Sequence, residues 1–208
     1  MQRKKTEVLD SILCAAETLF AQTDFSSVSM RDVSSLSGVT LGNIYHYFPS
    51  KEALFAALVS PATSAMETMI RSVFNPLNAS FGKARLIGNP SDVADSMAIR
   101  FVKLLTDCRS SLSLLFFHNR GSAYEHYVEQ FVDVSSCQIF SYLSEQTQAE
   151  NQTLASKAII TDCVSRTIGF FRDMTYGRFT DDELMRRALE FSQFCCAGYK
   201  TLLLPRQY

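Results

Sequence analysis

Residues 29–54 read SMRDVSSLSGVTLGNIYHYFPSKEAL, and this stretch decides how the rest of the chain is interpreted. Ser29 is a good N-cap, and Asp32 adds a negative charge in the first turn of a short helix predicted over Met30 to Leu36. Gly38 follows this helix at the point where a left-handed turn residue is needed. The first half of the stretch therefore predicts a capped helix that ends in a tight turn.

The second half predicts another short helix and the start of a longer one. Thr40 caps a helix over Leu41 to Tyr47, which Pro49 ends because a proline disfavours helical backbone in the residue before it. Ser50 then caps the next helix, which begins at Lys51. Two short helices around a glycine turn are typical of a helix-turn-helix, whose second helix lies in the major groove of DNA.

The residues around this stretch complete a small helical unit. Apolar positions with helical spacing predict a first helix from about Thr6 to Gln22. The helix that begins at Lys51 is predicted to continue to about Phe74, with a kink at Pro61, because proline removes a backbone hydrogen bond. The side chains expected to face the core are Phe25, Val33, Leu36, Ile44, Tyr47 and Phe48.

The remaining sequence shows only helical periodicity. Residues 75–90 are rich in Gly, Pro and Asn and predict a loop. The capping box from Thr180 to Glu183 marks the start of the last helix, and Gly177 closes the one before it. The predicted helices are 91–106, 110–119, 122–148, 153–176 and 180–204. The chain is expected to be all-α, with a helix-turn-helix domain over 1–50, linked through the helix 51–74 to a helical domain over 51–208.

Composition sets limits on this interpretation. The 208 residues are 47% hydrophobic and 20% charged, with a formal net charge of -1, so a DNA-binding surface must concentrate its positive charge locally. The six cysteines lack C-x-x-C spacing, which is typical of a reduced cytosolic protein. Neither an export signal nor an apolar run of roughly 18 residues is evident, so we expect a cytoplasmic protein with no membrane partner.

The sequence GVTLGNIYHYFPSKEAL over 38–54, preceded by MRDV over 30–33, resembles the TetR family of bacterial transcriptional regulators. The resemblance covers about residues 6–60. It implies a DNA-binding homodimer without a cofactor, a repressor whose C-terminal domain holds a pocket for a small-molecule effector. The last two helices, about 153–176 and 180–204, are expected to form the dimer, so that two recognition helices meet a near-palindromic operator on double-stranded DNA. The residues expected on the dimer faces are Ile159, Cys163, Ile168, Phe171, Leu184, Ala188, Phe191, Cys195, Tyr199 and Leu202.

The candidate DNA contacts fall into two groups. The N-terminal residues of a recognition helix meet base edges, and here these are Thr40, Leu41, Gly42 and Asn43. Hydroxyl, imidazole and cationic groups contact the phosphates, and the candidates are Ser29, Arg31, Tyr45, His46 and Lys51. A basic arm over residues 3–5 can add affinity that does not depend on sequence.

The effector pocket implied by the resemblance is assigned to the middle helices. Its many phenylalanines favour an apolar or aromatic ligand, with His118, Tyr124 and Arg172 orienting any polar group. The remaining candidates are Phe101, Leu105, Phe116, Phe117, Tyr127, Phe131, Ile168 and Phe171. A ligand that fits only one conformation would shift the helix through Pro61 and change the spacing of the recognition helices.

Two other classes of protein are alternatives to a ligand-responsive regulator. A ligand-independent DNA-binding or protein-interaction dimer would share the same helices without an effector. An enzyme or carrier is disfavoured, because the sequence has no Ser-His-Asp arrangement, glycine-rich phosphate loop or nucleophile motif. His118 and His126 are eight residues apart without an E-x-x-H pair, which disfavours a metal site.

Overall fold

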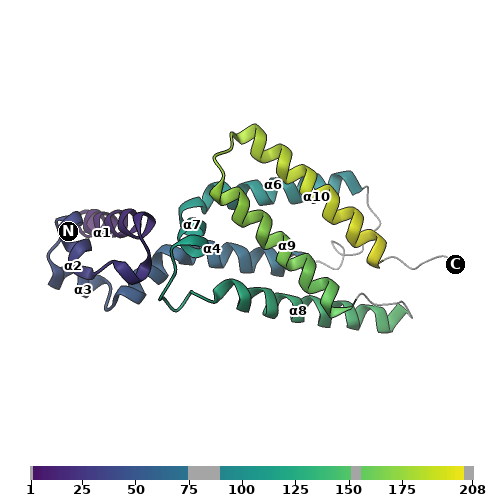
Figure 1. The fold of residues 1–208 in the computed structure, drawn as a ribbon, viewed down its shortest axis with the longest axis horizontal. Coiled ribbons are helices and arrows are strands. Elements are labelled where there is room, and N and C mark those ends of the chain that lie inside the picture. Colours follow the sequence, from purple (N-terminus) through teal and green to yellow (C-terminus); the bar gives the residue numbers. More distant parts are fainter. Residues whose placement is uncertain (1, 75–89, 151–155, 204–208) are drawn as a thin grey trace. The chain divides into compact units, whose positions relative to one another are not determined.

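The computed structural model describes residues 2–74, 90–150 and 156–203. The regular structure of these ranges is entirely helical, which confirms the all-α prediction (Figure 1). The elements are α1 (Gln2–Gln22), the 3-10 turn η1 (Phe25–Ser27), α2 (Met30–Ser37), α3 (Leu41–Tyr47), α4 (Lys51–Phe74), α6 (Pro90–Asp107), α7 (Arg109–Phe117), α8 (Tyr127–Glu150), α9 (Lys157–Tyr176) and α10 (Asp181–Leu203).

The chain folds into two compact units. The first unit joins residues 1–64 to residues 108–127, and the second joins residues 65–107 to residues 128–208. Helix α4 passes from one unit into the other after Ser64, and the chain returns to the first unit at Cys108. A segment from the middle of the sequence is therefore part of the N-terminal unit, and the domain boundary at residue 50 remains a prediction.

Three phenylalanine rings form the centre of the first unit. The Phe20 and Phe55 rings meet edge to face with centroids 5.1 Å apart, and Phe25 lies 5.8 Å and 5.1 Å from them. Phe25, the first residue of η1, is 4% exposed, which confirms the prediction that it faces the core. Such pairs add roughly 0.5–1.5 kcal/mol each beyond the burial of their area. They fix α1, η1 and α4 to one another.

The predicted core of the helix-turn-helix is wrong at one position. Val33 and Ile44 are fully buried and Phe48 is 9% exposed, whereas Leu36 is 53% exposed and the prediction that it faces inward is wrong. Helix α2 ends one residue beyond Leu36, and Val39 from the following turn is buried there instead. A two-turn helix is too short for its apolar face to be set by periodicity alone.

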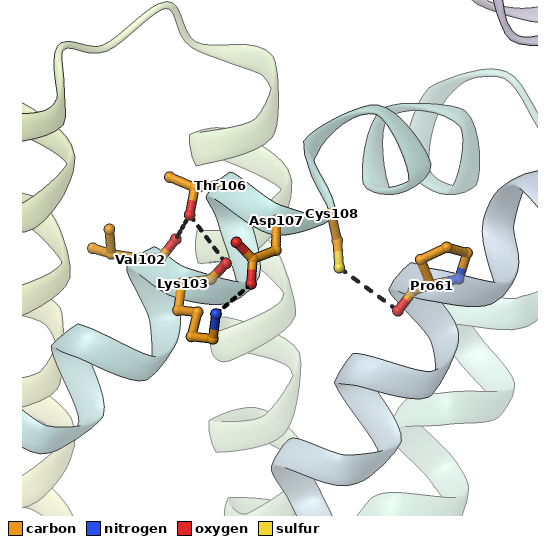
Figure 2. Close-up of polar contacts among 6 residues, drawn as sticks. All are labelled: Pro61, Val102, Lys103, Thr106, Asp107 and Cys108. Atoms are coloured by element: carbon orange, nitrogen blue, oxygen red, sulfur yellow. Dashed lines mark hydrogen bonds and ion pairs between the residues drawn. The ribbon is translucent and has the colours of Figure 1, made fainter. Parts of the chain in front are cut away.

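Cys108 joins α6 to α7 without an intervening loop. Its thiol donates to the Pro61 carbonyl oxygen at 3.7 Å, which connects the start of α7 to α4 (Figure 2). On the α6 side of this junction, the Lys103 ammonium donates to Asp107 at 2.7 Å, and the Thr106 hydroxyl donates to main-chain oxygens of its own helix (Figure 2). Cys108 is therefore the single residue between α6 and α7.

The second unit is built from long helices with apolar faces. Helix α6 packs along α10, and α9 contacts both (Figure 1). Phe101 of α6 lies 5.1 Å from Phe171 between ring centroids, while Phe170 and Phe191 stack at 4.4 Å. A separate cluster of Ile139, Ile160 and Val164 joins α8 to α9.

Several residues predicted to lie on the dimer face belong to this core instead. Ile168, Phe171, Leu184 and Ala188 are each at most 4% exposed within a single chain, so their assignment to the dimer surface is wrong. The helical pattern showed that α9 and α10 are amphipathic. It did not show whether the apolar stripe packs against α6 or against a second chain, because both alternatives bury the same kind of surface.

The predicted absence of a membrane-length apolar segment needs a correction. Within the described ranges, Lys51–Arg71 of α4 is long and apolar enough to cross a membrane by length and composition alone. Polar residues such as Ser60 and Thr63 break its apolar run, which is why the sequence criterion missed it. Leu54, Phe55 and Val59 of this helix are fully buried in the first unit, and a helix that packs in a protein core passes the same test.

Candidate nucleic-acid interface

The N-terminus of α2 is closed by the predicted capping residues. The Ser29 N–H and hydroxyl donate to one Asp32 carboxylate oxygen at 2.8 Å and 2.6 Å, and the Asp32 N–H donates to the Ser29 hydroxyl at 3.3 Å. These hydrogen bonds lower the pKa of the Asp32 carboxyl below its ordinary value. The Ser29 hydroxyl is thus occupied, and the helix end already holds an anion of its own.

The turn between α2 and α3 is fixed by backbone conformation and by a serine. Gly38 has a φ of 68°, in the left-handed region that favours glycine, and its N–H donates to the Ser34 carbonyl at 3.1 Å. The Ser34 hydroxyl then donates to the Val39 carbonyl oxygen at 2.7 Å. The angle between the two helices is therefore set by contacts within the motif.

Helix α3 separates a buried side from a polar, exposed side. Ile44 is fully buried, while Gly42, Asn43 and His46 are exposed and Tyr45 is 46% exposed. These exposed residues are the ones predicted to contact DNA. Leu41 at the start of the helix is half-buried.

Several of these polar groups are free to bind another molecule. The exposed Thr40 side chain stands at the N-cap of α3 without making a cap hydrogen bond. Asn43, Tyr45 and the exposed Arg31 of α2 have no hydrogen-bond or ion-pair partner among the described residues. The structure thus leaves these donors and acceptors exposed on α2 and α3, and their contacts with DNA remain a prediction.

Lys51 differs from the other candidate phosphate contacts. Its ammonium donates to the Phe25 carbonyl oxygen at 2.7 Å and to the Val28 carbonyl oxygen at 2.8 Å, and it lies 4.2 Å from the centre of the Phe25 ring. The side chain is half-buried, and burial lowers the pKa of the Lys51 ammonium. Two of its three donors are directed to the protein's own main chain, and its phosphate contact remains a prediction.

Residues 118–120, which follow α7, bind the η1 turn that Lys51 also contacts, and the sequence analysis did not predict this contact. The Phe25 N–H donates to the His118 carbonyl at 3.0 Å, and the Ser26 N–H donates to the Arg120 carbonyl at 3.1 Å. The His118 ring nitrogen Nδ1 lies 2.7 Å from the Thr23 carbonyl oxygen, so Nδ1 must carry a proton there. No local sequence signal connects residues so far apart in the chain.

The loop between α7 and α8 has a defined conformation. The Asn119 amide donates to the Leu115 and Tyr124 carbonyl oxygens at 2.8 Å and 2.7 Å, and the Ser122 hydroxyl donates to the Asn119 carbonyl at 2.7 Å. Gly121 adopts a φ of 82°. These side chains take over backbone groups that a helix would use, so α8 begins at Tyr127 and the predicted start at 122 is wrong.

The candidate pocket residues do not form one cluster within a single unit. His118 and Tyr124 belong to the first unit, where the Tyr124 ring lies 6.1 Å from that of Phe55. Arg172 is exposed on α9 of the second unit. In the first unit lie Phe116, Phe117 and Tyr127, and in the second lie Phe101, Leu105, Phe131, Ile168 and Phe171.

The other reactive side chains of the described residues are the cysteines and the possible metal ligands. Across the described residues, no three or more His, Cys, Asp or Glu side chains gather as a metal-binding group. Burial raises the pKa of the Cys195 thiol to about 12, with the neighbouring Cys196 and Cys163 contributing, so Cys195 is protonated at neutral pH. A protonated thiol is a poor nucleophile.

Comparison with known proteins places this geometry in a family. Residues 12–58 match the family described as bacterial regulatory proteins, tetR family. An uncharacterised HTH-type transcriptional regulator of Mycobacterium tuberculosis is 36% identical over 74 residues, covering 34% of this chain and 37% of that protein. The HTH-type transcriptional repressor KstR2 of Rhodococcus jostii is 28% identical over 142 residues, covering 68% of this chain and 57% of that protein. The chain therefore matches from about a third to somewhat over half of the length of these relatives.

Solved structures extend the likeness to the whole fold. A TetR-like transcriptional regulator from Rhodococcus sp. RHA1 aligns with a TM-score of 0.57 at 16% identity, over 91% of this chain and 93% of that one. NalD of Pseudomonas aeruginosa, the secondary repressor of the MexAB-OprM multidrug efflux pump, aligns with a TM-score of 0.58 at 18% identity over both full lengths. Residues 12–58 thus belong to the family of bacterial regulatory proteins named tetR, and the chain has the fold of its TetR-like neighbours, an N-terminal helix-turn-helix followed by a helical C-terminal domain.

Proposed function

We propose that the protein is a sequence-specific DNA-binding transcriptional regulator, a repressor that a small apolar or aromatic ligand releases from its operator. The observation that carries the proposal is the two-sided character of α3. Ile44 is fully buried, whereas Asn43 and Tyr45 are exposed and have no partner among the described residues. Relatives such as KstR2 are transcriptional repressors, which supports the same function here.

Binding to the DNA upstream of the gene that encodes the protein tests the proposal. The Asn43 amide can both donate to and accept from adenine, and a good bidentate contact of this kind contributes about 1–3 kcal/mol of discrimination between bases. We expect Asn43→Ala to weaken operator binding about 10- to 100-fold and to relax the preference at one base pair. Tyr45→Phe removes only the hydroxyl group, and we expect a smaller loss that is the same for every sequence.

The control is Leu36→Ala, which changes an exposed residue of α2 outside the predicted contacts. Fluorescence anisotropy with labelled operator and mutated operators measures all of these affinities. Wild-type protein that binds operator and unrelated DNA equally well would refute sequence-specific recognition.

We place the homodimer on exposed parts of α9 and α10, a revision of the buried set that the sequence suggested. Phe194 is 66% exposed on α10, near Ala197 and Gly198, which are also exposed. Gly169 and Gly198 lie within helices, where glycine costs about 0.5–1 kcal/mol relative to alanine. Beyond the backbone of its own helix and its chain neighbours, a Cβ atom at either glycine would meet no described atom within 4 Å, so packing inside one chain does not require them. Close approach of a second chain would.

Light scattering tests this dimer. We expect wild-type protein to be a dimer and Phe194→Glu to be a monomer, because a buried charge at a helix interface is strongly unfavourable. Ile99→Glu is the matched control, since Ile99 is 58% exposed on α6. A dimeric Phe194→Glu protein would contradict the proposed interface. Dimerisation would set the two recognition helices about 34–36 Å apart on a near-palindromic operator.

We place the effector, an apolar or aromatic ligand, beside the aromatic cluster of Phe101 and Phe171 in the second unit. The nearby α10 also contains Ser192, whose fully buried hydroxyl has no hydrogen-bond partner among the described residues. A polar group on such a ligand would satisfy that hydroxyl, which otherwise carries a desolvation cost.

Thermal-shift screening with apolar and aromatic compounds, followed by operator release, tests the effector. A true effector raises the melting temperature and lowers operator affinity, and Phe101→Ala should lose both responses. If no compound changes operator binding, the alternative of a ligand-independent DNA-binding dimer is favoured. A cytoplasmic location agrees with either regulator.

A further inference from the structure

The ammonium of Lys51 connects two elements of the first unit. Lys51 is the first residue of α4, and its two hydrogen-bond acceptors, the carbonyl oxygens of Phe25 and Val28, lie at the two ends of the η1 turn. Val28 directly precedes Ser29, the N-cap of α2. One side chain therefore fixes the start of α4 to the backbone that leads into the helix-turn-helix.

The turn that Lys51 holds has few other constraints on this side. The hydrogen bond from the Val28 N–H to the Phe25 carbonyl is long, at 3.4 Å, and the Asp24 N-cap makes no side-chain hydrogen bond. On the opposite edge, the amides of Phe25 and Ser26 donate to the main chain of residues 118–120. Lys51 supplies donors to the carbonyl edge, and the later segment supplies acceptors to the amide edge.

The surroundings of Lys51 do not suit an anchor for an external phosphate. Its ammonium lies against the face of the buried Phe25 ring at 4.2 Å, which adds a cation–π contact. Moving the ammonium to a phosphate would break two hydrogen bonds of 2.7 Å and 2.8 Å to the main chain. Burial also disfavours the charged form of the group.

We propose that Lys51 is a positioning residue for DNA binding: its ammonium holds the Phe25–Val28 backbone so that α2 and α3 keep their orientation, and it is not a phosphate contact. This inference rests on the proposed DNA-binding function. It assigns to the lysine of the SKEAL sequence a role different from the one expected from the sequence.

The salt dependence of operator binding separates the two roles. Each phosphate contact contributes about 0.9 to the slope of log affinity against log salt, because it releases counterions from DNA. We expect Lys51→Met to weaken operator binding on the order of tenfold at each salt concentration without changing the slope. Arg31→Met is the comparison, since Arg31 is an exposed cation without a partner among the described residues. That variant should lower the slope by about one.

A conservative variant and a spectroscopic measurement complete the test. Lys51→Arg keeps charged donors for the two carbonyl oxygens and should restore most of the affinity. In the wild type, amide NMR shifts of residues 25–30 report the held turn, and we expect them to change in Lys51→Met and to return toward wild type in Lys51→Arg.

The outcomes distinguish the inference from the proposed function. A slope lowered by about one in Lys51→Met, or operator affinity equal to that of wild type, would overturn the positioning role. Wild-type protein that binds no operator would refute the proposed function. In that case, unchanged amide shifts over residues 25–30 in Lys51→Met would overturn the positioning role separately.

Discussion

The two units of this protein differ in the contacts that fix the helices within each unit. In the first unit, short elements pack on three phenylalanine rings and are also fixed by polar side chains that bind main-chain groups, such as Lys51 on the Phe25 and Val28 carbonyls. In the second unit, long helices meet through apolar faces, such as the stacked Phe170 and Phe191 rings. Polar contacts are directional, so they specify an orientation, whereas apolar burial rewards any arrangement that removes the same surface from water. A regulator can use the first kind of unit to present a precise surface and the second kind to change its packing.

Among the changes that test this comparison, removal of the central phenylalanine ring of the first unit should cause the largest loss of stability. Phe25 is 4% exposed and contacts two other rings, so we expect Phe25→Ala to lower the free energy of unfolding by about 3–5 kcal/mol. Urea denaturation measures the change. Leu36→Ala, at a residue 53% exposed in the same unit, should cost less than about 1 kcal/mol. Equal losses in the two variants would show that the rings do not organise the unit.

The turn between α2 and α3 predicts opposite effects at two glycines. Gly38 has a φ of 68°, so a Cβ atom is strained there, and Gly38→Ala should destabilise the protein by about 1 kcal/mol. Gly42 lies inside α3, where an added Cβ atom would meet no other atom within 4 Å, so Gly42→Ala should stabilise the protein by about 0.5–1 kcal/mol. Thermal unfolding of both variants measures the difference. A stabilising Gly38→Ala would show that the left-handed turn is not required.

Acid should lower the stability of both units through their capping boxes, by less than the substitutions above. Hydrogen bonds lower the pKa of the Asp32 carboxyl from its ordinary 3.8 and that of the Glu183 carboxyl from its ordinary 4.5. A carboxyl whose pKa is lower in the folded state contributes stability above the unfolded-state pKa, and this is lost as the pH falls through the folded-state value. Stability should therefore decline below about pH 4.5.

Variants assign this acid dependence to the caps. Asp32→Asn and Glu183→Gln remove the titrating groups, so each should make the loss of stability between about pH 5 and pH 2 less steep. Asp10→Asn, an exposed position of α1 outside either box, is the control. Denaturation midpoints measured across this pH range compare the three. An acid dependence as steep in the double cap variant as in wild type would locate it elsewhere.

The boundaries of most helices followed from local signals. The capping pairs Ser29 with Asp32 and Thr180 with Glu183 form as predicted, and α3 and α4 span the predicted residues. Each signal needs only neighbouring residues, because a cap is satisfied within one helical turn. The start of α8 was missed because Asn119 and Ser122 compete for backbone groups through their own side chains.

The exposure of the candidate residues on α3 followed from the sequence, whereas the contacts of Lys51 did not. The exposed residues of α3 lie on one face because the helical period and the buried Ile44 determine that face. The partners of Lys51 could not be predicted, since its acceptors are carbonyl oxygens 26 and 23 residues away. Backbone acceptors are present at every residue, so no sequence pattern marks the ones that a lysine will meet.

Local sequence signals were enough to specify the helix-turn-helix, its caps and its glycine turn, because these depend on residues close together along the chain. Three outcomes came from the three-dimensional fold alone: residues 108–127 belong with the N-terminal unit, Ile168 and Phe171 are buried within one chain, and the Lys51 ammonium binds the turn before α2. These outcomes depend on which apolar faces and which main-chain groups meet in space. The amino-acid pattern specifies that such groups must be buried or paired, and the fold selects their partners.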